Sequence, residues 1–500
     1  MPPGRLRRLL AATTVAALAG ATALVAAGQD PGPRRPAAPP RVQVYLTTTT
    51  DPGGRTVGKG LERQRPLTFR PGPGGGITVD PSRTYQTFRG GGASFTDTAA
   101  WLLGSSRTLD DATREATLRA LFDRRHGIGL SFLRNPMGAS DLARYGYTYD
   151  DLPAGRTDPD LRHFSVGHDL ADILPLTARA RALNPALTVM ASPWTAPAWM
   201  KDNGSLDQGR LRARYHGTYA RYFVKYLQAY RAHGVPVAYV SAQNEPTCCA
   251  GLPSMRWTGA GLARFTRDAL LPALRGAGLR TKVLALDWNW DRYARFGAPV
   301  VGDPAIRGHP NFGGVAWHGY AGDVAEQSRV HDRHPRLAAF GTENSGGAWV
   351  ADQHREDLRD LIAATRNWSS SWVKWSLAVD QNGGPHHGGC ATCTGLVTVH
   401  RGDAAHGSVD RTVEYYTMGH LTKFVRPGAR RIASTTSAEV PDVAWRNPDG
   451  STAVIAYNAT DTPRRTVLTW HGHHAVYRLP ARASVTFVWP ARGAAARTGR

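Results

Sequence analysis

The chain lacks the sequence signatures of several large protein classes. It contains no His-Glu-x-x-His motif of metallopeptidases and no Gly-x-Ser-x-Gly elbow of esterases. Zinc-finger spacing and an aromatic RNA-binding signature are also missing. Downstream of the N-terminal segment, no apolar run is long enough to span a membrane. These absences argue against a metallopeptidase, an esterase, a membrane-embedded protein and a dedicated nucleic-acid-binding protein.

Lysine is scarce, and most of the positive charge comes from arginine. The chain has 61 basic and 39 acidic residues, which gives a formal net charge of +22. The arginines are spread along the chain rather than gathered in one segment, as is typical of a solvated surface. Weak attraction to acidic polymers or cell walls is the alternative. We therefore predict no nucleic-acid partner.

The N-terminus has the pattern of a secretory signal. Met1–Ala27 begins with arginines, continues with an apolar run and ends in small residues. Residues 28–41 are rich in Pro, Ala and Arg and are interpreted as a linker. We expect an exported protein without a stable membrane anchor, and a retained N-terminal anchor is the alternative.

Cysteine is rare, and its four copies form two close pairs. They are Cys248, Cys249, Cys390 and Cys393. An even number of cysteines in an exported protein predicts disulfides, for which three full pairings are open. The alternative is a zinc site that combines His386 and His387 with the nearby cysteines. We favour disulfides and expect no metal and no cofactor.

Short apolar runs alternate with helical patterns through the middle of the chain. A buried parallel strand has such a continuous apolar run. The helical patterns include Arg212–Ala232, whose aromatic residues have helical spacing and are interpreted as core. About eight βα units in order predict a (β/α)8 TIM barrel, placed at residues 86–425. The candidate strands are Phe88–Phe95, Leu130–Arg134, Thr188–Ala191, Val237–Ala242, Lys282–Leu286, Gly314–Trp317, Leu337–Gly341 and Val373–Val379.

Both ends of the chain read as strands without intervening helices. Short strands are predicted within 42–85, and further strands within 426–490 alternate around turns such as Asn447–Gly450. This texture predicts a β-sandwich beside the barrel, formed from the N-terminal strands and the C-terminal region. Residues 491–500 are predicted to be a disordered tail.

Two glutamates stand where candidate barrel strands end. Glu245 follows Val237–Ala242 within Gln-Asn-Glu-Pro, and Glu343 follows Leu337–Gly341. Asn-Glu-Pro alone is also ordinary turn chemistry. A closed barrel, however, brings the carboxyl ends of its strands to one face. Two carboxylates above one pocket are what glycoside hydrolysis requires, one as proton donor and one ionised.

Tryptophans near the same strand ends are candidate stacking platforms for sugar rings. They are Trp194, Trp288, Trp317 and Trp375. Each alone is as compatible with packing as with binding. Together with the paired carboxylates they favour a carbohydrate site.

An ordered set of motifs resembles the glucosylceramidase-like glycoside hydrolases (glycoside hydrolase family 30). The resemblance runs from about residue 90 to 432 and continues more weakly beyond. The motifs are GGGASFTDTAA (90–100), LRNPMGASD (133–141), YTYDD (147–151), ASPWTAPAWMKDNGSL (191–206), YFVKYLQAY (222–230), QNEP (243–246), WHGYAGD (317–323), TENSGG (342–347) and YYTMGHLTKFVRPGARRI (415–432).

The resemblance implies a retaining β-glycosidase with assigned roles for its motif residues. Glu245 is expected to be the general acid/base, Glu343 the nucleophile, and Asn244 a ligand of the sugar 2-hydroxyl. A retaining mechanism implies carboxyl groups about 5 Å apart. The remaining pocket positions are expected to orient the substrate or a carboxylate, and they are Arg134, Asp141, Trp194, His318, Tyr320 and Trp375.

The cysteine-containing loops depart from many relatives and bear on the substrate. Cys248 and Cys249 directly follow the acid/base motif, so a disulfide between loops is expected to shape the cleft. The loop with Cys390 and Cys393, after the last barrel strand, resembles those of endo-β-1,6-glucanases, and export suits a polysaccharide better than a glycolipid. Alternatives are a glucosylceramidase, an exo-acting β-glucosidase, β-xylosidase or β-fucosidase, and a non-catalytic carbohydrate-binding protein.

Overall fold

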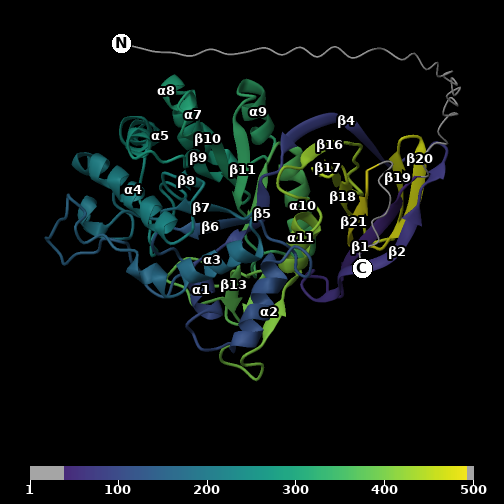
Figure 1. The fold of residues 1–500 in the computed structure, drawn as a ribbon, viewed down its shortest axis with the longest axis horizontal. Helices are drawn as coiled ribbons and strands as arrows, with labels where there is room; N and C mark the ends of the chain where they lie inside the picture. Colours follow the sequence, from purple (N-terminus) through teal and green to yellow (C-terminus); the bar gives the residue numbers. More distant parts are fainter. Residues whose placement is uncertain (1–38, 492–500) are drawn as a thin grey trace, which may run out of the picture. The chain divides into compact units, whose positions relative to one another are not determined.

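Eight parallel strands form the barrel that carries the candidate site (Figure 1). The computed structural model describes residues 39–491. The strands are β5 (Gly90–Ser94), β6 (Phe132–Pro136), β7 (Thr188–Ser192), β8 (Tyr239–Ser241), β9 (Lys282–Asn289), β10 (Phe312–His318), β11 (Ala338–Glu343) and β12 (Ser371–Lys374). Strands β5 to β11 pair in chain order, and β12 pairs with β5.

The barrel closes between β11 and β12. The Ser370 N–H donates to the Ala339 oxygen over 2.8 Å, and the Trp375 N–H donates to the Asn344 oxygen over 2.8 Å. One buried cluster takes a side chain from each of six strands, namely Phe132, Met190, Leu284, Ala316, Phe340 and Val373. The predicted (β/α)8 barrel is confirmed.

Helices alternate with the barrel strands and bury one apolar face. They include α2 (Asp111–Phe122), α3 (Ile173–Leu183), α4 (His216–Ala232), α5 (Gly259–Phe265), α6 (Leu271–Gly276), α9 (Glu326–Arg333) and α10 (Gln353–Arg366). On α4, Tyr219, Tyr222, Phe223 and Tyr226 are fully buried. The interpretation of these aromatics as core is therefore confirmed.

The predicted strand Val373–Val379 is wrong as a single element. Its first part is β12, which ends at Lys374, and Trp375 then makes an isolated parallel bridge to Ser345. Its last part is β13 (Ala378–Asp380), which joins a separate small sheet with β14 (Val397–Val399) and β15 (Val409–Arg411). This division places the loop between β13 and β14 beside the barrel mouth.

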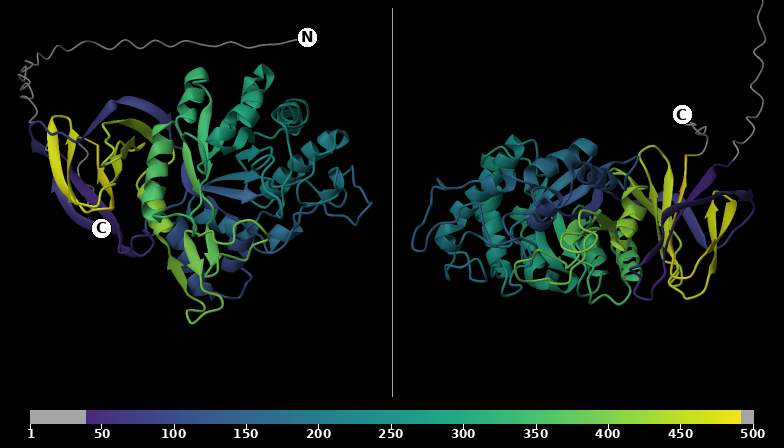
Figure 2. Two further views of the ribbon diagram at one scale, coloured as in Figure 1. Left: turned by 180° about the vertical axis from the view of Figure 1, so that it is seen from behind. Right: turned by 90° about the horizontal axis from the view of Figure 1, so that it is seen from below.

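Strands from both chain ends interleave in one ten-stranded sheet. The N-terminal strands are β1 (Arg41–Thr49), β2 (Val57–Thr68), β3 (Arg70–Pro71) and β4 (Ile77–Thr87). The C-terminal strands are β16 (Arg430–Ser434), β17 (Asp442–Arg446), β18 (Thr452–Tyr457), β19 (Arg464–Trp470), β20 (His473–Leu479) and β21 (Ser484–Trp489). β1 pairs with β21, and β4 lies between β16 and β19. Figure 2 shows these purple and yellow strands side by side. The predicted sandwich from both chain ends is confirmed.

Strands β17 and β18 of this sheet are buried on both faces and join the sheet to the barrel. On β17, Ala444 faces the sandwich core, whereas Val443 and Trp445 belong to the cluster that contains α10 and α11 (Val413–Thr422). His420 of α11 is fully buried, and its ring nitrogens contact the hydroxyls of Thr486 (2.7 Å) and Thr47 (2.9 Å). Burial lowers the pKa of His420 to about 3, so it links the two regions as a neutral ring.

Three terminal predictions lie outside the described residues. They are the signal peptide at 1–27, nearly all of the linker at 28–41, and the tail after Ala491. Within residues 39–491, no helix is both long and apolar enough to cross a membrane.

Candidate active site

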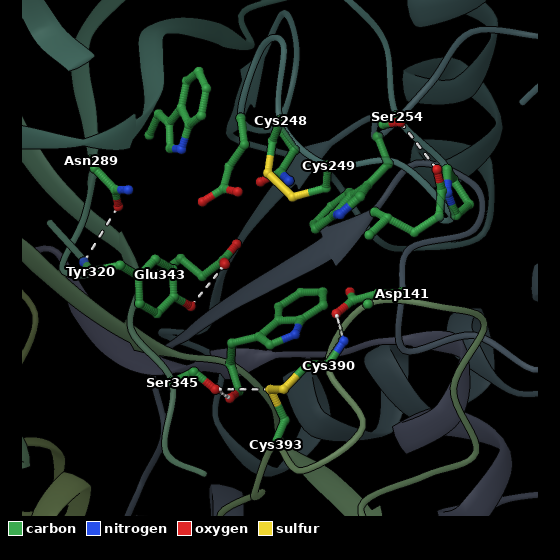
Figure 3. A pocket seen from close by; sticks show the side chains of 18 of the residues that line it. Asp141, Cys248, Cys249, Ser254, Asn289, Tyr320, Glu343, Ser345, Cys390 and Cys393 are labelled. Carbon is green, nitrogen blue, oxygen red and sulfur yellow. Dashed lines mark hydrogen bonds between the residues drawn. A yellow bond between two sulfur atoms is a disulfide. The ribbon is translucent and has the colours of Figure 1, made fainter. Parts of the chain in front are cut away.

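A cavity of about 490 Å³ opens where the barrel strands end (Figure 3). It lies at the face where barrel enzymes place their chemistry. Its lining includes both candidate glutamates, four tryptophans and all four cysteines. The lining residues are Asp141, Trp194, Asn244, Glu245, Cys248, Cys249, Leu252, Pro253, Ser254, Trp288, Asn289, Arg292, Tyr320, Glu343, Ser345, Trp349, Trp375, Gly389, Cys390 and Cys393.

Glu245 stands on a tight turn just past the end of β8. Its backbone is left-handed (φ 40°), as are Thr247 (φ 77°) and Cys249 (φ 37°). The Glu245 N–H donates to the Asp287 oxygen over 3.0 Å, and its carbonyl accepts from the Cys248 N–H over 2.9 Å. Left-handed non-glycine residues are uncommon and cluster at functional sites. The turn is therefore held by its surroundings rather than by local preference.

Glu343 is the last residue of β11 and points into the cavity from a regular strand. Arg134 Nη1 donates to its Oε2 over 2.6 Å, and the Tyr320 hydroxyl donates to its Oε1 over 2.9 Å. Its side chain is only 8% exposed. A buried cation and a hydroxyl donor therefore hold one oxygen each of this carboxylate.

The two carboxylates face each other across a short gap. One oxygen of Glu245, one oxygen of Glu343 and one nitrogen of His318 all lie within 4.8 Å of one another. His318 Nδ1 is 2.8 Å from Glu245 Oε1 and 3.9 Å from Glu343 Oε1. Both ring nitrogens of His318 face carboxylates, because Nε2 is 3.1 Å from Asp287 Oδ1. The group is therefore a hydrogen-bonded network.

Asp287 is the functional residue that the sequence reasoning did not single out. It is fully buried at the end of β9, and its Oδ2 accepts from Arg134 Nη2 over 2.9 Å. Hydroxyls of Ser192, Ser241 and Thr342 also donate to it. Burial opposes its ionised form, but Arg134 and the His318 ring outweigh burial and hold the pKa of Asp287 well below its usual range. Its place just after a candidate strand was the available signal.

Burial and charge give Glu245 and His318 unusual proton affinities. Burial raises the pKa of Glu245, and the neighbouring His318 ring opposes that rise. Burial disfavours the charged form of His318, but the nearby carboxylates of Glu343, Asp287 and Glu245 outweigh it and raise its pKa to about 9. His318 therefore carries a positive charge at neutral pH.

Arg134 also fixes Asn244, the residue before Glu245. The Asn244 Oδ1 accepts from Arg134 Nη2 over 2.6 Å. The amide oxygen is occupied in this way, which leaves the amide NH₂ as the group that Asn244 offers to the cavity.

Three of the four predicted sugar platforms line the cavity. Trp194 and Trp375 stack on each other with ring centroids 5.1 Å apart, and Trp288 lies on the cavity wall. The prediction for Trp317 is wrong, because its ring is buried against Tyr293 with centroids 5.3 Å apart. Successive side chains of a strand point to opposite sides, and His318 takes the inward direction.

Trp349 is a cavity residue that no motif indicated. It lies in the loop after β11, is 55% exposed, and lines the cavity. No periodic pattern surrounds it, so nothing in the sequence separates it from other exposed aromatics. An exposed indole at the cavity rim suits a sugar face.

Asp141 lies at the base of the loop between β13 and β14. Its Oδ2 accepts from the Cys390 N–H over 3.3 Å, and its backbone oxygen accepts from the His387 N–H over 2.6 Å. Burial, together with the nearby charge of Glu343, raises the pKa of Asp141 to about 7. Through its two hydrogen bonds, Asp141 joins the loop that carries His387 and Cys390 to the cavity.

The disulfides are confirmed, but the expected bridge between loops is wrong. Cys248 bonds to its neighbour Cys249, and Cys390 bonds to Cys393. Each bridge closes its own loop, because the two cysteine pairs approach the cavity from different strand ends. The sulfur atoms of the alternative zinc cluster are thus bonded to each other rather than present as thiolates.

Two family models match most of the described chain. The family model described as "Glycosyl hydrolase family 30 TIM-barrel domain" matches residues 88–425, and "Glycosyl hydrolase family 30 beta sandwich domain" matches residues 428–487. An endo-1,6-beta-D-glucanase of Neurospora crassa is 34% identical over 451 residues, covering 84% of this chain and 89% of the relative. The lysosomal acid glucosylceramidase of Mus musculus is 29% identical over 415 residues, covering 78% of each chain.

A solved endo-beta1,6-glucanase has the same fold. It superposes with a TM-score of 0.81 and 29% sequence identity, covering 90% of this chain and 99% of that chain. Both the barrel and the sandwich are thus shared with enzymes of one family. The chain belongs to glycosyl hydrolase family 30, and it is a glycosidase.

Proposed function

We propose that this glycosidase retains configuration and cleaves β-1,6-glucan internally, with Glu343 as nucleophile and Glu245 as general acid/base. The observation that carries the proposal is the separation of the two carboxylates, whose nearest oxygens lie within 4.8 Å. Retaining glycosidases place their carboxyl groups about 5 Å apart, whereas inverting enzymes need room for a water molecule between them. The double-displacement mechanism fits this spacing.

Glu343 suits the attacking role because two donors fix its carboxylate at the cavity. Arg134 and Tyr320 both donate to its carboxylate oxygens. In the first step, a Glu343 oxygen bonds to the anomeric carbon as the bond to the leaving oxygen breaks. The leaving oxygen takes the proton of Glu245, and a glycosyl-enzyme intermediate forms.

Glu245 suits the proton-transfer role because burial raises its pKa. It starts the cycle protonated and ends the first step ionised, beside the positively charged His318 ring at 2.8 Å. In the second step, Glu245 takes a proton from water as the water oxygen attacks the anomeric carbon and Glu343 leaves. His318 thus stabilises the carboxylate that the first step creates.

Asn244 is the proposed ligand of the sugar 2-hydroxyl. Arg134 occupies its amide oxygen over 2.6 Å, which fixes the orientation of the amide and leaves its NH₂ to donate. A hydrogen bond to this hydroxyl strengthens in the transition state. Arg134 therefore orients Glu343 and Asn244 together.

The choice of β-1,6-glucan is supported by similarity. Three fungal proteins named endo-1,6-beta-D-glucanases are 31–34% identical over most of their length. The glucosylceramidase relatives are 26–29% identical. The signal-like Met1–Ala27 supports an enzyme that meets an extracellular polysaccharide.

A substrate panel tests the proposal. The purified chain is incubated with β-1,6-glucan, β-1,3-glucan, xylan, galactan and glucosylceramide, and the products are separated by size. We expect β-1,6-linked oligosaccharides of several lengths from the first substrate, unaffected by a chelator. Glucose as the sole early product would overturn internal cleavage, and faster release from glucosylceramide would overturn the polymer assignment.

A further inference from the structure

The Cys248–Cys249 disulfide lies directly beside the proposed proton donor. One carboxylate oxygen of Glu245 and both sulfur atoms lie within 4.8 Å of one another. Figure 3 shows this bridge at the cavity, on the side opposite Cys390 and Cys393. None of the catalytic steps above uses these sulfur atoms.

Side chains from neighbouring loops hold this disulfide in place. The Gln208 side-chain amide donates to the backbone oxygens of Cys248, over 2.9 Å, and of Cys249. Arg256 donates in turn to the Gln208 side-chain oxygen. The Thr247 hydroxyl donates to the Trp257 oxygen over 2.7 Å and accepts from the Trp257 N–H over 3.0 Å. The turn is therefore fixed independently of any bound sugar.

The contacts made by Gln208 leave the apolar part of the disulfide facing the cavity. Gln208 engages both cysteine carbonyls, so the groups that remain are the sulfur atoms and their methylenes. Leu252 and Pro253 also line the cavity. Sulfur is soft and polarisable and packs well against apolar faces. A pyranose ring presents such a face through its C–H groups.

The position of Glu245 identifies which sugar reaches this surface. A proton donor must lie about 2.6–3.2 Å from the oxygen that it protonates. That oxygen belongs to the leaving sugar. The sulfur atoms lie within 4.8 Å of an oxygen of the same carboxylate, so a sugar ring attached to the leaving oxygen is large enough to reach them.

We propose that the Cys248–Cys249 disulfide is the platform for the sugar on the leaving-group side of the scissile bond. It selects leaving groups that are themselves sugar rings. In the second catalytic step the same surface holds an acceptor sugar when one replaces water. The inference rests on the proposed role of Glu245 as proton donor.

The second disulfide provides a matched control. Cys390–Cys393 also lines the cavity, but Cys393 is 3% exposed and its sulfur lies 3.2 Å from the Ser345 hydroxyl. It packs with Trp194 and Trp375 rather than with Glu245. Removing this bridge tests the general effect of losing a disulfide at the cavity.

The test compares two substrates that share a glucosyl group. The double variant Cys248→Ala/Cys249→Ala is assayed on β-1,6-gluco-oligosaccharides and on β-glucosyl fluoride, whose leaving group is too small to reach the sulfur atoms. We expect kcat/KM to fall about 10-fold for the oligosaccharides, mainly through KM, and less than about 2-fold for the fluoride. Transfer of glucosyl groups to added oligosaccharides should fall in parallel.

Other outcomes separate the explanations. An equal loss on both substrates would overturn the platform and assign the disulfide to holding the Glu245 turn, and no loss on either would also overturn it. Cys390→Ala/Cys393→Ala should not reproduce the substrate difference. Should the first variant fail to fold, reducing the Cys390→Ala/Cys393→Ala protein, whose remaining disulfide is Cys248–Cys249, and confirming its two free thiols by mass spectrometry gives the same comparison. Failure of the proposed function would show in a separate experiment. In that case, the loss of activity of Glu245→Gln would be the same for good and poor leaving groups.

Discussion

The two glutamates of the site are chemically identical, but their surroundings differ in nearly every respect. Glu343 ends a regular strand and receives hydrogen bonds from Arg134 and Tyr320. Glu245 stands on a left-handed turn, contacts His318, and lies beside two sulfur atoms. Two donors fix the carboxylate of Glu343, whereas burial raises the pKa of Glu245. The proposed division of roles follows from these environments.

A chain of alternating charges connects the two settings. Arg134 contacts both Glu343 and Asp287, and His318 contacts both Asp287 and Glu245. A negative Asp287 thus stands between two positive groups, each of which serves one glutamate. This buried network therefore has two arms that meet at Asp287: the Arg134 arm leads to Glu343, and the His318 arm leads to Glu245.

The largest expected effect is that of Glu343→Gln, which removes the attacking charge but keeps the shape of the side chain. We expect kcat to fall about 10⁴- to 10⁶-fold on every substrate, whatever its leaving group. Initial rates on β-1,6-glucan and on an aryl β-glucoside give the measurement. Glu439→Gln, at an exposed carboxylate of the sandwich, is the control. Normal turnover by the Glu343 variant would end the assignment.

Glu245→Gln should show a smaller loss that depends on the leaving group. Without a proton donor, we expect about 10²- to 10⁴-fold slower cleavage of the glucan. A dinitrophenyl glucoside, whose leaving group needs no proton, should form the intermediate at close to the normal rate. Pre-steady-state bursts on the two substrates provide the test. An equal loss on both substrates would contradict the role of Glu245 as proton donor, and with it the difference between the two glutamates.

The His318 arm should make the stability of the fold depend on pH. Its pKa is about 9 in the folded protein and about 6.5 when unfolded, so its contribution is complete below pH 6.5 and is lost as pH rises through 9. Relative to His318→Gln, the free energy of unfolding of the native enzyme should fall by roughly 3 kcal/mol across this range. Urea titrations at several pH values measure it. Parallel pH curves for the two proteins would show that Glu245, Asp287 and Glu343 do not hold His318 charged.

Tyr320→Phe should have the smallest effect, because it removes one of the two donors to Glu343 and keeps the ring. A hydrogen bond to a charged group contributes about 1.5–3 kcal/mol, so we expect a loss of about 10- to 100-fold in kcat. Steady-state kinetics on the aryl glucoside are sufficient. An unchanged kcat would mean that the hydrogen bond from Arg134 is sufficient to hold the Glu343 carboxylate for catalysis.

The barrel and the two glutamates were predictable because buried parallel strands leave a clear pattern. Continuous apolar runs end abruptly in polar residues, as at Val237–Glu245 and Leu337–Glu343. Helix α11 left no such pattern, since it is buried almost all round and has no polar face. β2 lies within the region 42–85 where strands are predicted, but its own sequence is polar and lacks a strand pattern, because it lies at the sheet edge.

The parts of the site that were not predictable depend on contacts between distant segments. Asp287 matters because Arg134 and His318 converge on it from other strands. Trp317 was placed wrongly because a strand end does not reveal which side chain turns inward. The cysteine pairing was also undetermined, since only the folded loops show that each pair closes on itself.

The most direct test of the account is to trap the intermediate and locate its covalent bond. A 2-deoxy-2-fluoro-β-glucosyl fluoride should form a glycosyl-enzyme that breaks down slowly, because the fluorine destabilises the transition state. Mass spectrometry of the digested protein is then predicted to find one fluoroglucosyl group on the peptide that carries Glu343. A label on Glu245, or turnover without any covalent adduct, would contradict the proposed division between the two glutamates.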